Sequence, residues 1–283
     1  MFAPDGLLVL LTDGPTVVLP GPQTFVGFLV GDFNNDGNPD LLYRANEESP
    51  QQRPPAEFLT YLGNGRGGFT SLPPMTTPTT LSTCVTGDMN RDARLDLVCV
   101  GSDLERHTQV LRVLRGHGDG TFHADPPVVL LAAAEGLTPQ DLQVADVNRD
   151  GRLDVVVLNA GFSGLPDFLE VWLGNGAGGL ATGGRVESTM EGSFRGFPEC
   201  LRIADLNRDG RQDLVVYRGE GQLGVALGSG SGFGSVSEVW RAFEVRYPTR
   251  TSIGIADIDV DGHADVITPL GWVLHGRGDG TFP

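Results

Sequence analysis

The chain has 283 residues, 40% of them hydrophobic, with 41 glycines and 19 prolines spread between apolar runs. This composition favours a packed interior of short strands and tight turns over a disordered chain. The formal net charge is −16, and the lack of a basic stripe argues against nucleic acid as a partner. No apolar run approaches the ~20 residues of a membrane helix, so we expect no membrane span.

The first predicted element lies before residue 22. Residues 6–20 (GLLVLLTDGPTVVLP) read as one or two strands. The start lacks the basic region of a signal peptide, and Asp13 follows its short apolar stretch closely. If the protein is exported, we expect its leader to lie outside this sequence.

A nine-residue acidic pattern then returns five times, with first aspartates 56, 58, 59 and 52 residues apart. A period of about fifty residues is typical of propellers, solenoids and arrays, in which each repeat is one supersecondary unit. The five copies are DFNNDGNPD (32–40), DMNRDARLD (88–96), DVNRDGRLD (146–154), DLNRDGRQD (205–213) and DIDVDGHAD (257–265).

The third copy gives the clearest local pattern. Residues 141–145 alternate before the acidic loop, 153–160 form a β-branched run after it, and 168–180 form a run ending in a glycine turn. Solid apolar runs of four to eight residues indicate strands that are covered on both faces. We therefore predict an all-β propeller of about five four-stranded blades, each with its acidic loop between the first two strands.

Glycine turns recur in the other copies and supply the positive φ that tight hairpins need. They are LGNGRGGF (62–69), RGHGDGTF (115–122), LGSGSGFG (227–234) and HGRGDGTF (275–282). We expect the aromatic residue that closes each turn to pack between neighbouring blades. These residues are Phe69, Phe122, Phe233 and Phe282.

Five equivalent units predict a single domain over residues 1–283. The last copy stops after its glycine turn, so we expect residues 1–21 to complete the last blade and close a ring. The alternative is an open window of a longer array of six or seven blades, whose exposed edges would aggregate. The expected repeats are approximately 22–80, 81–138, 139–195, 196–247 and 248–283.

Each acidic loop presents oxygen donors at positions 1, 3, 5 and 9, and position 7 can add its backbone carbonyl. Calcium takes six to eight such oxygens. We therefore expect about five Ca²⁺ ions, held mainly for structure. The predicted ligands are Asp32, Asn34, Asp36, Asn38 and Asp40; Asp88, Asn90, Asp92, Arg94 and Asp96; Asp146, Asn148, Asp150, Arg152 and Asp154; Asp205, Asn207, Asp209, Arg211 and Asp213; and Asp257, Asp259, Asp261, His263 and Asp265.

Details of the loops and their competitors refine this prediction. Position 6 is glycine in four copies and Ala93 in the second, where we expect a strained turn or weaker affinity.

An EF-hand would need helices and a glutamate at position 12, where these loops have Tyr43, Cys99, Val157, Val216 and Thr268. Zinc is disfavoured because no Cys or His cluster is visible. Magnesium usually retains more water than so many carboxylates suggest.

Three cysteines do not make a disulfide framework. Cys84 and Cys99 flank the second loop on strands expected to pair, so a bridge between them is conceivable. Free cysteine is commonly buried, and three buried thiols, Cys200 included, are the favoured interpretation.

These repeats resemble the FG-GAP/VCBS family, the integrin α-chain type of calcium-binding β-propeller. The resemblance covers residue 22 to the end and rests on D-x-[ND]-x-D-G-x-x-D followed by the glycine turn. It implies calcium in the loops and a propeller that is often seven-bladed, against five motifs here. Members include adhesion proteins and lectins, so the resemblance implies a secreted or cell-surface location.

We expect a calcium-stabilised extracellular binding module, carbohydrate-binding in the manner of a lectin or adhesin. The alternative is a structural or protein-interaction propeller, so the expected partner is a glycan or an extracellular protein. Aromatic candidates for ligand contact are Phe162, Phe194, Phe197, Trp240 and Tyr247; Trp172 and Trp272 are expected to serve packing.

A polysaccharide-acting enzyme is the third hypothesis. No nucleophile elbow, phosphate loop or metalloprotease motif is visible, and Glu47, Glu48 and Glu170 have no informative spacing. We therefore expect no enzymatic activity.

Overall fold

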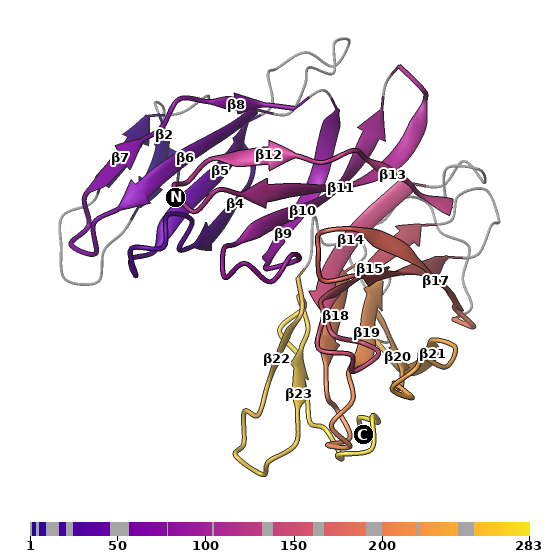
Figure 1. Cartoon of the computed structure of the whole chain (residues 1–283). Helices are drawn as coiled ribbons and strands as arrows, with labels where there is room; N and C mark the ends of the chain where they lie inside the picture. Colours follow the sequence, from indigo (N-terminus) through magenta and orange to yellow (C-terminus); the bar gives the residue numbers. More distant parts are fainter. Residues whose placement is uncertain are drawn as a thin grey trace. The chain divides into compact units, whose positions relative to one another are not determined.

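The computed structural model describes residues 2–3, 6–9, 17–20, 25–45, 57–77, 79–103, 105–131, 138–160, 167–190, 200–218, 221–242 and 252–283. Every regular element of more than one residue in these ranges is a β-strand (Figure 1). The same ranges hold no helix of the length and hydrophobicity that a membrane crossing needs.

The chain forms two compact units, Met1–Val129 and Leu130–Pro283. Each unit is built from antiparallel sheets that follow one another along the chain. The single domain over residues 1–283 stays a prediction.

The first unit holds three sheets. The N-terminal sheet contains β1 (Phe2–Ala3), β2 (Gly6–Val9) and β3 (Val17–Pro20). The next contains β4 (Phe25–Gly31), β5 (Asp40–Ala45), β6 (Glu57–Gly63) and β7 (Phe69–Ser71), with the short β8 (Met75–Thr76) also on β6. The third contains β9 (Thr80–Gly87), β10 (Asp96–Asp103), β11 (Thr108–Gly116) and β12 (Phe122–Ala124), with β13 (Val128–Val129) also on β11.

The second unit also holds three sheets. The first contains β14 (Thr138–Ala145), β15 (Asp154–Ala160), β16 (Phe168–Gly174) and β17 (Leu180–Glu187). The next contains β18 (Cys200–Ala204), β19 (Asp213–Arg218), β20 (Gln222–Ala226) and β21 (Ser237–Arg241). The last contains β22 (Gly254–Ala256), β23 (Asp265–Ile267) and β24 (Val273–Leu274).

The five sheets that begin at β4, β9, β14, β18 and β22 share one meander. Their first two strands flank the acidic loop, and the second strand pairs with the third. In β14 and β15, Ala145 lies opposite Asp154, so the loop closes directly onto the ends of the two strands. The prediction of an all-β chain with four-stranded sheets is confirmed, and the number of blades in a ring stays a prediction.

Apolar side chains on consecutive sheets form shared cores. Val156 and Leu169 of one sheet and Leu201 and Val216 of the next belong to one buried cluster. A second cluster joins β18–β21 to β22–β24 and includes Tyr217. The central strands are therefore covered on both faces, which explains their unbroken β-branched runs.

The aromatic residues that close the glycine turns belong to these cores, as predicted. Phe122 on β12 meets Phe33 of the first acidic loop edge to face, with ring centroids 5.7 Å apart. Phe282 is buried in the cluster that joins the last two sheets, and Phe233 packs against the cluster before it. Phe69 packs against a small cluster with Leu19 of β3.

The cysteine expectation is corrected. Cys84 on β9 and Cys99 on β10 form a disulfide, and they are direct partners across the two strands. Their side chains therefore point to the same face of the sheet, where a bridge can close. Cys200 is free and buried.

The N-terminal strands β1, β2 and β3 pair with one another as a sheet of their own. The expected completion of the last blade by residues 1–21 stays a prediction.

Candidate metal centre

Each acidic loop is folded by hydrogen bonds from its own backbone to its own side chains. In the third loop, Asp146 Oδ1 accepts from the N–H of Asp150 at 3.1 Å, and its Oδ2 accepts from the N–H of Gly151 at 2.8 Å. Asn148 Oδ1 also accepts from Asp150, at 3.0 Å, and Asp150 Oδ1 accepts from the N–H of Arg152 at 2.9 Å. The predicted donors at positions 1, 3 and 5 therefore surround one short turn.

The aspartate at position 9 has a different environment from the other three donors. Asp154 is fully buried, and its two oxygens accept from the N–H groups of Val147 at 3.1 Å and Gly174 at 2.9 Å. Val147 is the second residue of the loop, and Gly174 ends the third strand of the sheet. Position 9 thus fastens the acidic loop to β16.

The same two contacts occur in all five repeats. The position-9 aspartates are Asp40, Asp96, Asp154, Asp213 and Asp265. The glycines that donate to them lie at the end of the third strand or two residues past it and are called the strand-ending glycines: Gly63, Gly116, Gly174, Gly228 and Gly276. Sequence reasoning identified these aspartates only as ligands and missed this second role. The glycine that ends each third strand, at a fixed place before the turn, was the available signal.

Burial raises the pKa of Asp40, Asp96, Asp154 and Asp213 from the ordinary value of an aspartate. The two backbone N–H donors lower the pKa in part, and neighbouring loop aspartates raise it again. For Asp265, burial also raises the pKa, but the N–H donors and a nearby histidine outweigh it and leave the pKa low. A cation in the loop would favour the charged form of all five carboxylates.

The donors fit a hard divalent cation. In the fifth loop, carboxylate oxygens of Asp257, Asp259 and Asp261 lie within 4.8 Å of one another. Two oxygens that bind one Ca²⁺ at about 2.3–2.6 Å are at most about 5 Å apart. The residues present are therefore compatible with one shared ion.

The position-7 residues predicted to offer carbonyls also place charged side chains at the loops. Arg94, Arg152 and Arg211 lie 3.9, 3.4 and 3.2 Å from the position-5 aspartates of their own loops. These exposed pairs partly offset the loop charge. Asn38 and His263 occupy position 7 in the first and fifth loops, where their N–H groups donate to the position-5 aspartates.

Left-handed backbone occurs at two positions of every loop. Position 6 was expected, and Gly37, Gly151, Gly210 and Gly262 have φ between 76° and 91°, while Ala93 has φ 62°. Position 4 was missed, although its residues have φ between 58° and 63°. They are Asn35, Arg91, Arg149, Arg208 and Val260.

Successive loops within each unit touch through these two positions. Asn35 Nδ2 donates to the carbonyl of Ala93 at 3.2 Å. The guanidinium of Arg208 lies against Gly262, where an added Cβ would be 2.4 Å from Arg208 Nη2. Ala93 at position 6 is therefore contacted by a short side chain, Asn35, from position 4 of the loop before it. Gly262 at position 6 is contacted by a long one, Arg208, from position 4 of the loop before it.

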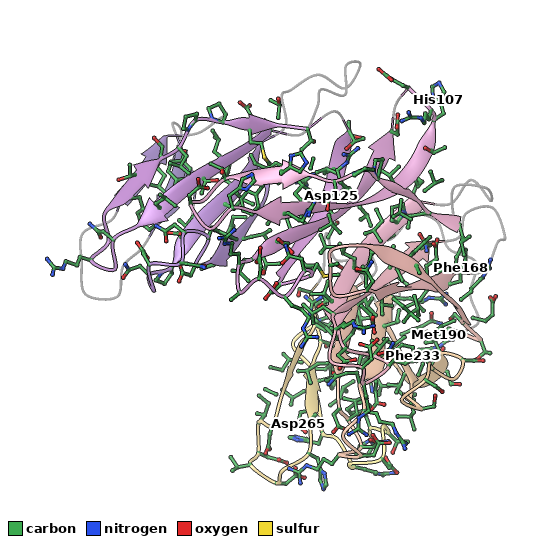
Figure 2. The ribbon with its side chains drawn as sticks, viewed as in Figure 1. His107, Asp125, Phe168, Met190, Phe233 and Asp265 are labelled. Atoms are coloured by element: carbon green, nitrogen blue, oxygen red, sulfur yellow. A yellow bond between two sulfur atoms is a disulfide. The ribbon has the colours of Figure 1, made fainter. Side chains whose placement is uncertain are left out.

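A cavity of about 180 Å³ lies beside the third loop, between the sheets β14–β17 and β18–β21. Its lining mixes apolar and polar side chains. Figure 2 labels Phe233 there, with Phe168 and Met190 in the same unit. The lining residues are Val147, Asn148, Val171, Leu173, Gly183, Gly184, Arg185, Val186, Ser231, Gly232 and Phe233.

Of the aromatic candidates for ligand contact, Phe162, Phe194, Phe197 and Tyr247 lie outside the described residues. Trp240 is half-buried on β21 and packs against the core that joins the last two sheets. Trp172 is buried as expected, whereas Trp272 is 58% exposed.

Glu170 is a structural residue of β16. It is fully buried and accepts hydrogen bonds from Asn159 Nδ2, Trp172 Nε1 and the N–H of Leu131. These contacts tie two strands to the segment before β14. Glu47 and Glu48 lie outside the described residues.

Comparison with solved structures found a GH43_1 enzyme from Xanthomonas citri, 14% identical, with a TM-score of 0.53 over 92% of this chain and 90% of that one. At this identity the likeness concerns the fold alone, which is propeller-like. A lectin from Agrocybe aegerita that recognises non-reducing terminal N-acetylglucosamine is 20% identical, with a TM-score of 0.49 over 91% of this chain and 78% of that one. An exo-β-1,3-galactanase from Phanerochaete chrysosporium is 9% identical, with a TM-score of 0.44 over 84% and 54%.

Comparison with curated protein sequences gave no match. The FG-GAP-like repeat family matches residues 88–157 and 205–268. The first region holds the second and third acidic loops, and the second region holds the fourth and fifth. These two regions of the chain are therefore FG-GAP-like repeats.

Proposed function

We propose that the protein is a calcium-stabilised β-propeller binding module that acts outside the cell and holds carbohydrate. The observation that carries the proposal is the cavity between two adjacent sheets, next to an acidic loop. Its second support is the set of five loops with oxygen donors in one arrangement.

The cavity offers the two kinds of contact that a sugar ring can make: apolar contact for its C–H groups and hydrogen bonds for its hydroxyls. The ring of Phe233 and the side chains of Val171 and Leu173 offer apolar surface for C–H groups. Asn148 and Ser231 at the rim offer hydrogen-bonding groups for hydroxyls. Small-ligand sites in proteins commonly have such an apolar lining with few polar groups. Its small volume suits one monosaccharide unit at the end of a chain.

Calcium would support this cavity through Asn148. This residue is position 3 of the third loop and also lines the cavity. Within each loop, positions 1, 3, 5 and 9 and the position-7 carbonyl would hold the ion, which supplies charge compensation. At tenfold above its Kd, one ion would stabilise the fold by about 1.4 kcal/mol.

The disulfide between Cys84 and Cys99 supports an extracellular location. Disulfides persist in oxidising compartments and are rare in the cytosol.

We infer a ring of five blades from the five acidic loops and from the last sheet. Within the described residues that sheet has three strands, whereas each of the four before it has four or more. Residues 1–21 would supply the missing strand. Deleting them is expected to abolish the hydrogen-exchange protection of β22–β24; unchanged protection would contradict the ring.

The test of function is a glycan-array screen of the purified chain in millimolar calcium and again in EDTA. We expect calcium-dependent binding to a set of related sugars. Silence on the array, with the protein shown to be folded, would instead favour a propeller that binds protein.

A variant pair locates the site. Ser231→Trp places a large side chain at the exposed rim of the cavity and should abolish binding. Ser235→Trp is the matched control, because Ser235 is exposed on the same segment and does not line the cavity. Equal binding by both variants would exclude the cavity as the sugar site.

A further inference from the structure

Two differences between the fifth repeat and the other four bring a new pair of side chains together at the acidic loop. Position 3 is Asp259, where the other loops have asparagine. The residue before the strand-ending glycine is His275, where the other sheets have Leu62, Arg115, Leu173 and Leu227. The two changes lie sixteen positions apart in the sequence but meet in the structure.

His275 directs a ring nitrogen at the loop. Its Nδ1 lies 3.1 Å from Asp259 Oδ2 and 3.6 Å from Asp265 Oδ1. One donor atom from each of the three residues lies within 4.8 Å of the others, which is the spacing of groups around one metal ion. Figure 2 labels Asp265, the buried member of the group, on the C-terminal sheet.

Two of the three side chains in the group are exposed to solvent, and the third is buried and held by hydrogen bonds. Asp265 is fully buried and held by the N–H groups of Ile258 and Gly276 at 2.8 and 2.9 Å. The side chains of His275 and Asp259 are 51% and 42% exposed. An ion could therefore enter from solvent and meet one ligand that is already fixed in place.

The change at position 3 also alters the charge. In the first four loops, the asparagine Nδ2 donates to the position-5 carboxylate at 3.1–3.2 Å. Asp259 has no such donor and adds a fourth carboxylate to Asp257, Asp261 and Asp265. The nearby guanidinium of Arg208, against Gly262, supplies one positive charge. The fifth loop therefore holds more negative charge than each of the other loops, and a bound cation would relieve more charge repulsion there.

Imidazole changes which cation the loop prefers. Calcium and magnesium take oxygen ligands, whereas zinc and its first-row neighbours accept imidazole nitrogen together with carboxylate. We propose that the fifth loop binds a first-row transition-metal ion, zinc above all, through His275 Nδ1 and the carboxylates of Asp259 and Asp265. The inference rests on the proposed function only in that the same loops hold cations.

Sequence patterns did not reveal this site, because His275 lies outside the nine-residue motif. It stands one residue past β24 and reaches the loop because the third strand runs back beside it. The same strand brings Leu173 or Leu227 to this place in other sheets.

The test is equilibrium dialysis against micromolar zinc in millimolar calcium, with bound metals measured by mass spectrometry. We expect one tightly bound zinc per chain and calcium in the other four loops. His275→Leu, which copies Leu173 and Leu227 of the third and fourth repeats, should weaken zinc binding by at least about tenfold. In zinc-free buffer its calcium content and calcium-dependent melting should equal those of the wild type, which shows that it folds.

Transplanting the two differences gives a gain-of-function control. Asn207→Asp combined with Leu227→His reproduces them in the fourth loop, at an exposed leucine. This double variant should bind a second zinc, and Leu227→His alone should bind it far more weakly. Cobalt in place of zinc should give absorption bands in the wild type that His275→Leu lacks.

Two results would overturn the inference and leave the calcium proposal standing. One is equal zinc binding by the wild type and His275→Leu. The other is calcium in the loops with no zinc bound in competition. A chain that binds neither metal would overturn both proposals.

Discussion

Two aspartates of the third loop have separate roles. Asp150 is exposed and bonds only within the loop, whereas Asp154 is buried and holds backbone N–H groups of the loop and of β16. Position 9 is therefore a structural residue even without metal.

Asp150→Ala should lower the melting temperature in calcium and change it little in EDTA, because the protein groups that bond to this carboxylate are exposed and can bond to water instead. Asp154→Ala should destabilise the chain in both conditions, because two buried N–H groups lose their acceptor at about 1–3 kcal/mol each. Thermal melts of both variants, with and without EDTA, test this difference. Equal losses for Asp150→Ala in the two buffers would refute its role as a ligand.

Val260 is a β-branched residue in left-handed backbone, with φ 61° and 85% exposure. This conformation costs an L-residue roughly 1–2 kcal/mol, and asparagine tolerates it best after glycine. Val260→Asn, which copies Asn35 of the first loop, should therefore stabilise the chain by about 1 kcal/mol in urea unfolding. Val273→Asn, an exposed strand position, is the control and should not stabilise; a similar gain there would contradict the argument.

The positive φ at position 4 could not be predicted from the sequence. Glycine at position 6 signals left-handed backbone by its identity, because other residues rarely adopt it. Arginine and valine at position 4 carry no such signal. Their conformation follows from the turn that gathers the surrounding donors.

At the scale of the elements, the glycine that ends each third strand explains how loop and strand meet. A Cβ on Gly228 would lie 2.1 Å from the carbonyl oxygen of Gln212, and one on Gly276 would lie 2.2 Å from that of Ala264. Both carbonyls belong to position 8 of the loop. Close backbone approach, and not positive φ, is the reason for glycine here.

Gly228→Ala should destabilise the chain by about 1–3 kcal/mol, because backbone atoms cannot move aside as a side chain can. It should also weaken the contact between Gly228 N–H and Asp213, now 2.8 Å long. Gly234→Ala is the matched control, since a Cβ there meets nothing within 4 Å. Urea unfolding of both variants is the measurement, and equal stabilities would contradict the close approach.

Much of each sheet could be predicted from the sequence because every copy repeats the same order of strands and turns. For example, the apolar run at residues 153–160 predicted a strand, and the observed strand β15 is Asp154–Ala160. His275 was assigned to a turn, since nothing in its neighbours shows that the strand before it returns to the acidic loop. Its role needed the pairing of β23 with β24.

For the whole molecule, the disulfide was the weakest point of the sequence reasoning. Spacing placed Cys84 and Cys99 on paired strands, but only the register makes them direct partners. A shift of one residue would have put the two side chains on opposite faces.

Thiol titration of the unfolded, unreduced chain should therefore find one free thiol, from Cys200. Reduction before unfolding should raise the number to three, the full cysteine count. Three thiols without reductant would contradict the disulfide and remove its support for an extracellular location.

Calcium is the central claim at this scale, since sixteen loop aspartates match the net charge of −16. Calcium titration by calorimetry, paired with thermal melts in calcium and in EDTA, tests it most directly. We expect about five ions per chain in zinc-free buffer and, at tenfold above Kd, several kcal/mol of stabilisation from sites worth about 1.4 kcal/mol each. Identical melting in both buffers, with no bound calcium, would contradict the account.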